Sequence, residues 1–362
     1  MLTGGEKKTK KTFIALIAVI LVVIIVGSSY GVLYALNQNP SGGGDEGGDV
    51  LTVVDPDGRT VKITQPVNTV ITLDAVATEI VCALGCEDRI IGIDSSSNFP
   101  PSVSEKTVVG ESYSPSLETV ISMNPDLVLG GAPLNYMNNQ TSKTIEDAGI
   151  PVFICESANP SVDSTESMVD QMCSLVTQLG QILDVEDKST QLVDYMQQYE
   201  TLVNDRIATL STEDRPSVYY EWYTDWQTSL VPSITQAGGV NIAEGSNEYA
   251  PVLSPEFVTE ANPDVIIRMV SSADHSLDDF TDQYNQITSR TALKSTTAVK
   301  EGHVYICDYG ITGGIESVVG YVQWAKWLHP DLFEDVNPVE IHQGLLEQFF
   351  SGVTYEGVYT YP

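Results

Sequence analysis

The sequence predicts an α/β protein of two lobes, each with a central, mainly parallel sheet, joined by one long helix and preceded by an N-terminal transmembrane helix. Two observations predict the lobes: one segment occurs twice, and the strands are short and apolar without polar alternation. A third, the helical spacing of apolar residues between the two copies, predicts the connecting helix.

The repeated segment runs from 117 to 129 and again from 255 to 267. Glu118 and Glu256 hold the same place in the two copies, 256 − 118 = 138 residues apart, and the prolines that follow them are also 138 apart. The copies therefore align without a gap. A period of this length indicates a duplicated lobe and not a solenoid repeat.

Each copy predicts a helix, a turn and a buried strand. Ser116 or Ser254 can cap the helix, and the glutamate then lies in the first turn, beside the positive end of the helix dipole. Asn-Pro-Asp ends the helix, because proline excludes the helical conformation from the residue before it. The strands that follow, Asp-Leu-Val-Leu and Asp-Val-Ile-Ile, are typical of a sheet covered on both faces.

The first segment predicts a membrane anchor. Four lysines precede an uncharged apolar run of 24 residues, Phe13 to Leu36, which would span about 36 Å as a helix. The basic flank should stay in the cytoplasm. A cleaved signal peptide is the alternative, but its apolar region is usually about 7 to 15 residues long. The length favours an uncleaved anchor, and thus a single-pass cell-membrane protein with a cytoplasmic N-terminus and an extracellular two-lobed domain.

The apolar run and the two repeat copies divide the chain into predicted domains. They are a cytoplasmic basic tail (1–12), the transmembrane anchor (13–36), a flexible glycine-rich acidic linker (37–50), the N-terminal α/β lobe (51–160), connecting helices including the strut between the lobes (161–211) and the C-terminal α/β lobe (212–362).

Charge and cysteine content exclude some classes of partner. From Asn37 onward there are 17 − 4 = 13 basic and 49 − 1 = 48 acidic residues, a formal charge of −35, which argues against nucleic acid as a partner. The five cysteines form no CxxC motif, and the spacing of Cys82 and Cys86 on a helix suits a disulfide poorly. We therefore expect buried free thiols.

The two lobes are predicted element by element from apolar runs and turn residues. The N-terminal lobe should hold a hairpin (51–54 with 59–63), a strand (70–73), a helix (77–84) and further strands (89–93 and 149–154). The C-terminal lobe should hold strands at 217–222 and 302–307 and helices at 318–328 and 341–350.

The strut is predicted from apolar residues at three- and four-residue steps after Val185: Leu192, Tyr195, Met196, Tyr199, Leu202, Val203, Ile207 and Leu210. A helix of about 24 residues would measure about 36 Å, the width of a small lobe. The alternative, one packing helix of a single large domain, leaves the duplication unexplained.

Several segments of the sequence resemble those of a known family. The segment Leu73–Ile80, followed by Ala83-Leu84-Gly85 and Arg89–Gly92, is similar to the opening of the ABC-transporter substrate-binding proteins for ferric siderophores, haem and vitamin B12. That family's further landmarks occur in the same order: Val109-Gly110, the two repeat copies, Gly238–Asn241 and Ala298–Tyr305.

The resemblance implies two lobes joined by a rigid helix, with the ligand in the cleft between them. It also implies that Glu118 and Glu256 sit at the outer tips of the lobes and dock arginines of a dimeric ABC permease with its ATPase subunits. Carboxylate and guanidinium can pair in a bidentate, directional way. Helix physics alone also favours a glutamate after a serine cap, so the residues by themselves leave both interpretations open, and the resemblance favours docking.

The predicted ligand contacts lie in loops at the carboxyl ends of strands, which face the crevice of open α/β sheets. Aromatic residues there could wall a planar macrocycle or a catecholate complex, and an arginine could meet an anionic ligand. These residues are Phe99, Tyr113, Trp222, Tyr223, Trp226, Arg268, Asp308 and Tyr309. For each aromatic the alternative is the lobe core, which is favoured for Tyr219 and Tyr220.

These observations predict the substrate-binding component of an ABC importer that captures a chelated metal complex: a ferric siderophore, haem or cobalamin. We expect a monomer with no catalytic residues and no cofactor of its own. The four histidines show no ligand spacing, which disfavours a bare metal ion. A surface adhesion protein is the alternative. A hydrolytic enzyme is less favoured, because no nucleophile elbow, HExxH helix or P-loop occurs.

Overall fold

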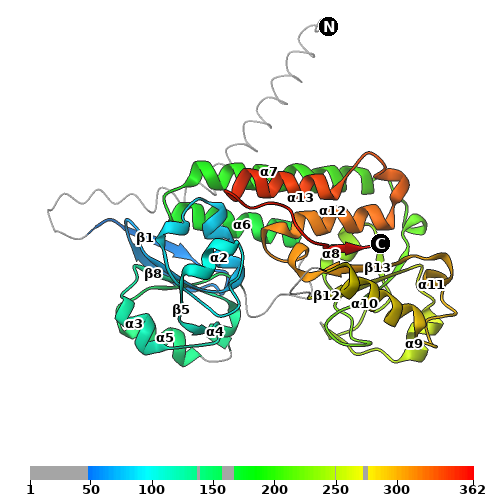
Figure 1. Cartoon of the computed structure of the whole chain (residues 1–362), viewed down its shortest axis with the longest axis horizontal. Coiled ribbons are helices and arrows are strands. Elements are labelled where there is room, and N and C mark those ends of the chain that lie inside the picture. The colour runs from blue at the N-terminus through cyan, green and yellow to red at the C-terminus, as the bar shows by residue number, and fades with distance from the viewer. Residues whose placement is uncertain (1–47, 137–138, 157–166, 249, 272–275) are drawn as a thin grey trace, which may run out of the picture.

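The computed structural model describes residues 48–136, 139–156, 167–248, 250–271 and 276–362. Figure 1 shows two α/β lobes side by side, with α7 and α13 lying across the top of the molecule. In the described residues each lobe is built on one five-stranded sheet. The α/β class predicted from the sequence is therefore confirmed.

The N-terminal sheet has the strand order β5-β4-β3-β8-β9, and all its pairings are parallel. All four residues of its central strand, Val70–Leu73, are buried, as expected for a sheet covered on both faces. An antiparallel hairpin, β1 (Val50–Val54) with β2 (Thr60–Thr64), precedes it. The other strands are β4 (Ile90–Ile93), β5 (Thr107–Val108), β6 (Gly110–Glu111), β7 (Ser114–Pro115), β8 (Leu127–Gly130) and β9 (Val152–Ile154).

The C-terminal sheet has the strand order β11-β10-β12-β13-β14. Its pairings are parallel except for β14, which runs antiparallel at one edge. The two sheets thus share the same arrangement about their central strands, as a duplicated lobe requires. The strands are β10 (Ser217–Glu221), β11 (Val240–Asn241), β12 (Val265–Val270), β13 (Val304–Asp308) and β14 (Thr360–Tyr361).

Helices cover both sheets and form the layer above them (Figure 1). The helices of the N-terminal lobe are α2 (Ala75–Ala83), α3 (Leu117–Met123), α4 (Ala132–Tyr136) and α5 (Asn139–Asp147). Between the sheets come α6 (Met168–Ile182) and α7 (Glu186–Ile207). The remaining helices are α8 (Pro232–Gln236), α9 (Pro255–Ala261), α10 (Leu277–Ser289), α11 (Thr297–Glu301), α12 (Ser317–Leu328) and α13 (Pro338–Phe349).

The long helix expected after Val185 is α7, with 22 residues. It packs against α6 and α12, and the Tyr195 hydroxyl donates to the carbonyl of Ile341 on α13 (2.6 Å). One cluster of buried apolar side chains runs from the N-terminal lobe through α6 and α7 into the C-terminal lobe. Because the lobes share this core, the helical layer holds them in one body.

The repeated segment folds as predicted in both copies. Ser116 and Ser254 accept from backbone N–H groups in the first turns of α3 and α9. Both helices end at an asparagine in the left-handed conformation, Asn124 (φ 48°) and Asn262 (φ 46°), a residue type that tolerates it.

The aspartate after each proline has a role that the sequence pattern did not reveal. Asp264 accepts from the backbone N–H (2.9 Å) and the hydroxyl (2.7 Å) of Ser217, at the start of β10. Asp126 does the same for Thr69, just before β3. Each copy thus fixes its strand β12 or β8 to the neighbouring strand.

We expect Asp264→Ala to lower the free energy of unfolding of the C-terminal lobe by about 1–3 kcal/mol, because both donors of Ser217 lose a charged acceptor. Urea unfolding followed by tryptophan fluorescence measures this, since all four tryptophans lie between 222 and 327. Asp194→Ala, an exposed aspartate on α7, is the control. Equal urea midpoints for the two variants would contradict the role of Asp264 in fixing β12 to β10.

The predicted membrane location is corrected by the structure. Over the described ranges, no helix has both the length and the apolar character needed to cross a bilayer. The single-pass cell-membrane location is therefore contradicted. The segment from which it was predicted, Phe13 to Leu36, lies outside the described residues, as do the basic tail and most of the linker. The predicted limits of the lobes and connecting helices stay predictions.

Candidate ligand-binding cleft

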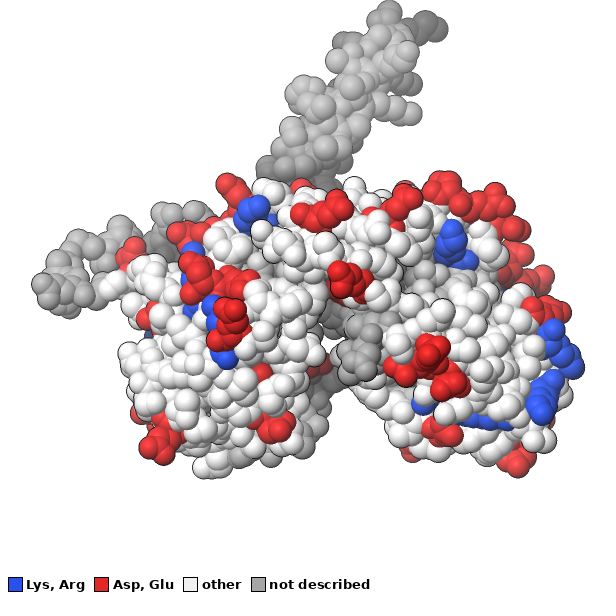
Figure 2. Space-filling model, in the orientation of Figure 1, with Lys and Arg blue, Asp and Glu red and all other residues white. Residues whose placement is uncertain are grey.

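Each sheet has one point where the strand order reverses, and both points are marked by acidic residues. In the N-terminal sheet the order reverses between β3 and β8, and Asp74 follows β3. In the C-terminal sheet it reverses between β10 and β12, where Glu221 ends β10. Ligands of open α/β sheets bind outside the carboxyl ends of the strands at such points. Figure 2 shows the molecular surface hollowed between the two lobes.

At the N-terminal reversal point, Asp74 caps α2 by accepting from the backbone N–H of Ala77 (2.9 Å). Gly131, which follows β8, leaves room for this carboxylate: a Cβ there would lie 2.6 Å from Asp74 Oδ2. Burial raises the pKa of the Asp74 carboxyl above its ordinary value. At the end of the next strand, buried Asp94 accepts from the hydroxyls of Ser96 and Ser97.

At the C-terminal reversal point, Glu221 is the centre of a charged network. Its buried carboxylate accepts from Arg268 Nη1 (2.9 Å) and from Arg290 Nη1 (2.5 Å). The hydroxyl of Tyr219 (2.6 Å) and the backbone N–H of Trp226 (3.0 Å) donate to it as well. Burial, followed by the charge of Glu221, raises the pKa of Tyr219, so its hydroxyl stays a donor. Sequence analysis missed Glu221 and Arg290.

Arg268, expected to meet an anionic ligand, pairs with groups of the protein through Nη1, while its buried Nε has no hydrogen-bond partner among the described residues. Besides Glu221, its guanidinium donates to the carbonyl of Trp222 (2.7 Å), and its side chain is only 11% exposed. Asp225 lies 4.0 Å from it and 2.8 Å from Arg290. The two arginines are therefore balanced by two carboxylates, and the site offers no excess positive charge.

Trp226 belongs to this network. Its φ of 67° is unusual for a large side chain, and the bond from its N–H to Glu221 holds it there. The indole stacks on Tyr219 (6.5 Å between centroids), and the Arg290 guanidinium lies 5.2 Å from its ring. Tyr219 and Tyr220 are buried, as predicted.

Three of the predicted aromatic residues come together at the ends of β10 and β13. The rings of Trp222 and Tyr223 lie 4.5 Å apart, and that of Tyr309 lies 6.2 Å from Tyr223. Tyr223 is 50% exposed and Tyr309 is 42% exposed. We call these three residues the aromatic cluster. It presents partly exposed ring surface beside the Glu221 network.

The other predicted contacts lie elsewhere. Phe99 packs its ring against Phe350 at the end of α13 (5.0 Å between centroids), so it bridges the lobes. Asp308 is buried, and its carboxylate accepts from the N–H of Gly310 (2.7 Å). Tyr113 is exposed in the β6–β7 hairpin, just before α3. Ligand contact by these residues stays a prediction.

The two predicted docking residues occupy equivalent sites. Glu118 and Glu256 are exposed in the first turns of α3 and α9. In Figure 1 these helices lie at the lower ends of the two lobes, away from the layer formed by α7 and α13. Docking of a partner there stays a prediction.

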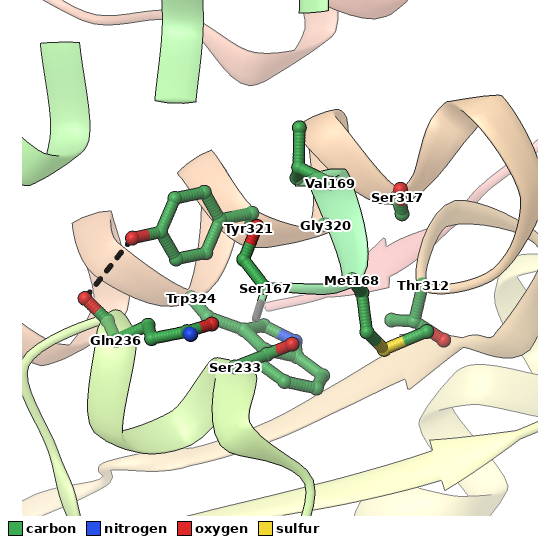
Figure 3. A pocket seen from close by; sticks show the side chains of 10 residues that line it. All are labelled: Ser167, Met168, Val169, Ser233, Gln236, Thr312, Ser317, Gly320, Tyr321 and Trp324. Carbon is green, nitrogen blue, oxygen red and sulfur yellow. Dashed lines mark hydrogen bonds between the residues drawn. The ribbon is translucent and has the colours of Figure 1, made fainter. Parts of the chain in front are cut away.

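A small cavity lies between the start of α6, α8 and α12 (Figure 3). Its volume of about 10 Å³ has room for one water molecule at most. Tyr321 closes one side by donating to the carbonyl of Gln236 (3.1 Å). The lining residues are Ser167, Met168, Val169, Ser233, Gln236, Thr312, Ser317, Gly320, Tyr321 and Trp324. A metal chelate needs far more room.

The part of the chain that the structure describes offers neither an exposed thiol nor a cluster of metal ligands. All five cysteines are free and buried, as predicted, and burial raises the pKa of Cys82, Cys173 and Cys307 to about 12. Within the described ranges, no group of three or more His, Cys, Asp or Glu side chains could hold a metal ion.

Comparison with known proteins agrees with this architecture. The sequence profile described as "Periplasmic binding protein" matches residues 70–309, more than half of the chain. A cobalamin-binding protein of Halobacterium salinarum is 29% identical over 263 residues, covering 70% of this chain and 67% of that protein. YvrC of Bacillus subtilis, an uncharacterized ABC transporter substrate-binding lipoprotein, is 24% identical over 299 residues, covering 79% and 87%.

A solved structure shares the fold. The TroA-like periplasmic binding protein FepB from Veillonella parvula superposes with a TM-score of 0.72 at 19% identity, covering 86% of this chain and 99% of that one. The family resemblance seen in the sequence is thus confirmed by profile and by fold. The chain belongs to the periplasmic binding protein family.

Proposed function

We propose that the protein is the substrate-binding component of an ABC importer, which captures a chelated metal complex between its lobes and delivers it to a permease. One observation carries this proposal: two equivalent lobes have equivalent strand-order reversal points, marked by Asp74 after β3 and Glu221 at the end of β10, and ligands of open α/β sheets bind outside the strand ends at such points. Membership of the periplasmic binding protein family supports it.

Cobalamin is our first candidate for the cargo, ahead of haem and ferric siderophores. Balance of Arg268 and Arg290 by Glu221 and Asp225 removes the reason for expecting an anionic chelate. The aromatic cluster offers exposed ring surface that suits a large macrocycle. The relative from Halobacterium salinarum, named for cobalamin binding, supports the same choice.

For delivery, we propose that Glu118 and Glu256 dock arginines of a permease dimer that carries the ATPase subunits. The two glutamates hold the same position, in the first turn after a serine cap, in two equivalent helices, and such a pseudo-twofold arrangement suits a twofold partner. An adhesion protein would leave this equivalence without a role.

Thermal unfolding with and without ligand tests the cargo. We expect cobalamin to raise the melting temperature, because a ligand at 100 times its Kd stabilises the folded state by about 2.7 kcal/mol. Tyr223→Ala should weaken this effect. Leu277→Ala, which removes a similarly exposed apolar side chain on α10, should not. If cobalamin, haem and ferric siderophores all leave the melting temperature unchanged, the proposed transport role fails.

A further inference from the structure

Two acidic side chains lie in segments that touch across the two lobes. Glu79 lies on α2 of the N-terminal lobe, and Glu316 ends the 3-10 helix η5 (Gly314–Glu316), which follows β13 of the C-terminal lobe. Helix α2 packs directly against η5. Figure 1 shows the orange segment before α12 reaching the N-terminal lobe beside α2. This contact joins α2 to the segment that leads into α12.

The contact is built around the carboxyl group of Glu79. Gly314 has φ 57° and no side chain, and a Cβ there would lie 2.4 Å from Glu79 Oε2. The backbone N–H of Ile315 donates to the carboxyl group. The other oxygen, Oε1, is buried and has no hydrogen-bond partner among the described residues. An ionised carboxylate with an unpartnered buried oxygen is costly.

The surroundings add further negative charge. Glu316 and, more weakly, Asp74 act on Glu79 as like charges. Beyond Glu316, His342 Nε2 on α13 lies 3.3 Å from its Oε2, and Tyr355 and Tyr359 pack their rings against His342. Burial, and then the charge of Glu316, raises the pKa of Glu79 well above its ordinary value of 4.5.

We propose that Glu79 is a proton-operated latch between the lobes: the neutral carboxyl holds α2 against η5, and its ionisation drives them apart. The sign follows from the raised pKa. The contact is fully stabilised below pH 4.5, and that stabilisation is lost as pH rises through the pKa of Glu79 in the closed state. One proton changes the ratio of closed to open molecules by at most about tenfold per pH unit.

Equivalent positions on α3 and α9 allow the distance between the lobes to be measured. Ser122 and Glu260 are exposed, equivalent positions on α3 and α9, 260 − 122 = 138 residues apart. Spin labels on Ser122→Cys and Glu260→Cys would report the separation of the lobes by double electron–electron resonance. The native thiols are buried, which keeps them from competing for the label.

We expect the separation in the ligand-free chain to increase as pH rises from 5 to 9. Glu79→Gln should keep the closed separation throughout, and Gly314→Ala, whose Cβ displaces the carboxyl group, should stay open throughout. Glu200→Gln is the control, because Glu200 is a buried glutamate with a raised pKa on α7, bonded to Ser167. It should titrate like the parent. Two results would contradict the proposal: a separation of the lobes that does not change with pH in the parent chain, or one that still changes with pH in Glu79→Gln.

Discussion

Reversing both tip charges, Glu118→Arg with Glu256→Arg, is expected to abolish uptake while leaving ligand affinity unchanged. The reason is electrostatic: the proposed partner presents arginines, and like charges at both contact points oppose docking. Because the two glutamates are exposed on α3 and α9, which lie at the lower ends of the lobes in Figure 1, their replacement should not disturb the cleft. Uptake of labelled cobalamin by cells and its binding to the purified chain separate the two effects.

The control for this experiment lies on the same helix. Glu260→Arg makes the same change of charge one turn beyond Glu256, at another exposed position of α9. It should leave uptake close to normal, so that a general effect of surface charge can be recognised. Equal loss of uptake and of ligand affinity in the double reversal would contradict the docking role.

The second large effect is expected at Glu221. Glu221→Gln removes the charge that balances Arg268 and Arg290 in a buried network, and breaking such a network costs about 3–5 kcal/mol. Urea unfolding followed by tryptophan fluorescence should show this loss in the C-terminal lobe, where Trp222 and Trp226 flank the network.

A surface ion pair gives the matched control for Glu221→Gln. Asp147→Asn removes the charge that pairs with Lys143 between two exposed side chains, and such pairs contribute at most about 1 kcal/mol. If Glu221→Gln costs no more stability than Asp147→Asn, the network does not hold the end of β10 in place, and Glu221 is not a fixed part of the proposed cleft.

The elements that the sequence predicts well are those with local causes. The strand at 70–73 was predicted with its observed limits, because three of its four residues are apolar and none is charged, as expected for a strand covered on both faces. The helix, turn and strand of the repeated unit were predicted, because its serine caps and Asn-Pro-Asp turns act within one segment; the contacts of its aspartate to a distant strand were not. The two-residue strand β14 carries no periodic signal and was missed.

The candidate site was harder to predict because its contacts join distant residues. Glu221 meets Arg268 and Arg290 across 47 and 69 residues, so the sequence displayed Arg268 without its partner. A signal was present, since a single acid ends the apolar strand Ser217–Glu221 and a single base interrupts the next strand of that sheet. The contact of Glu79 with Gly314 spans 314 − 79 = 235 residues and has no local signature.

The central claim is that one metal chelate binds each chain between the lobes, and native mass spectrometry of the protein purified from its own organism tests it most directly. We predict one added mass per chain that matches a metal chelate, with cobalamin the first candidate, and that disappears on unfolding. A chain that carries no added mass, and that takes up neither cobalamin, haem nor a ferric siderophore supplied in excess, would contradict the claim.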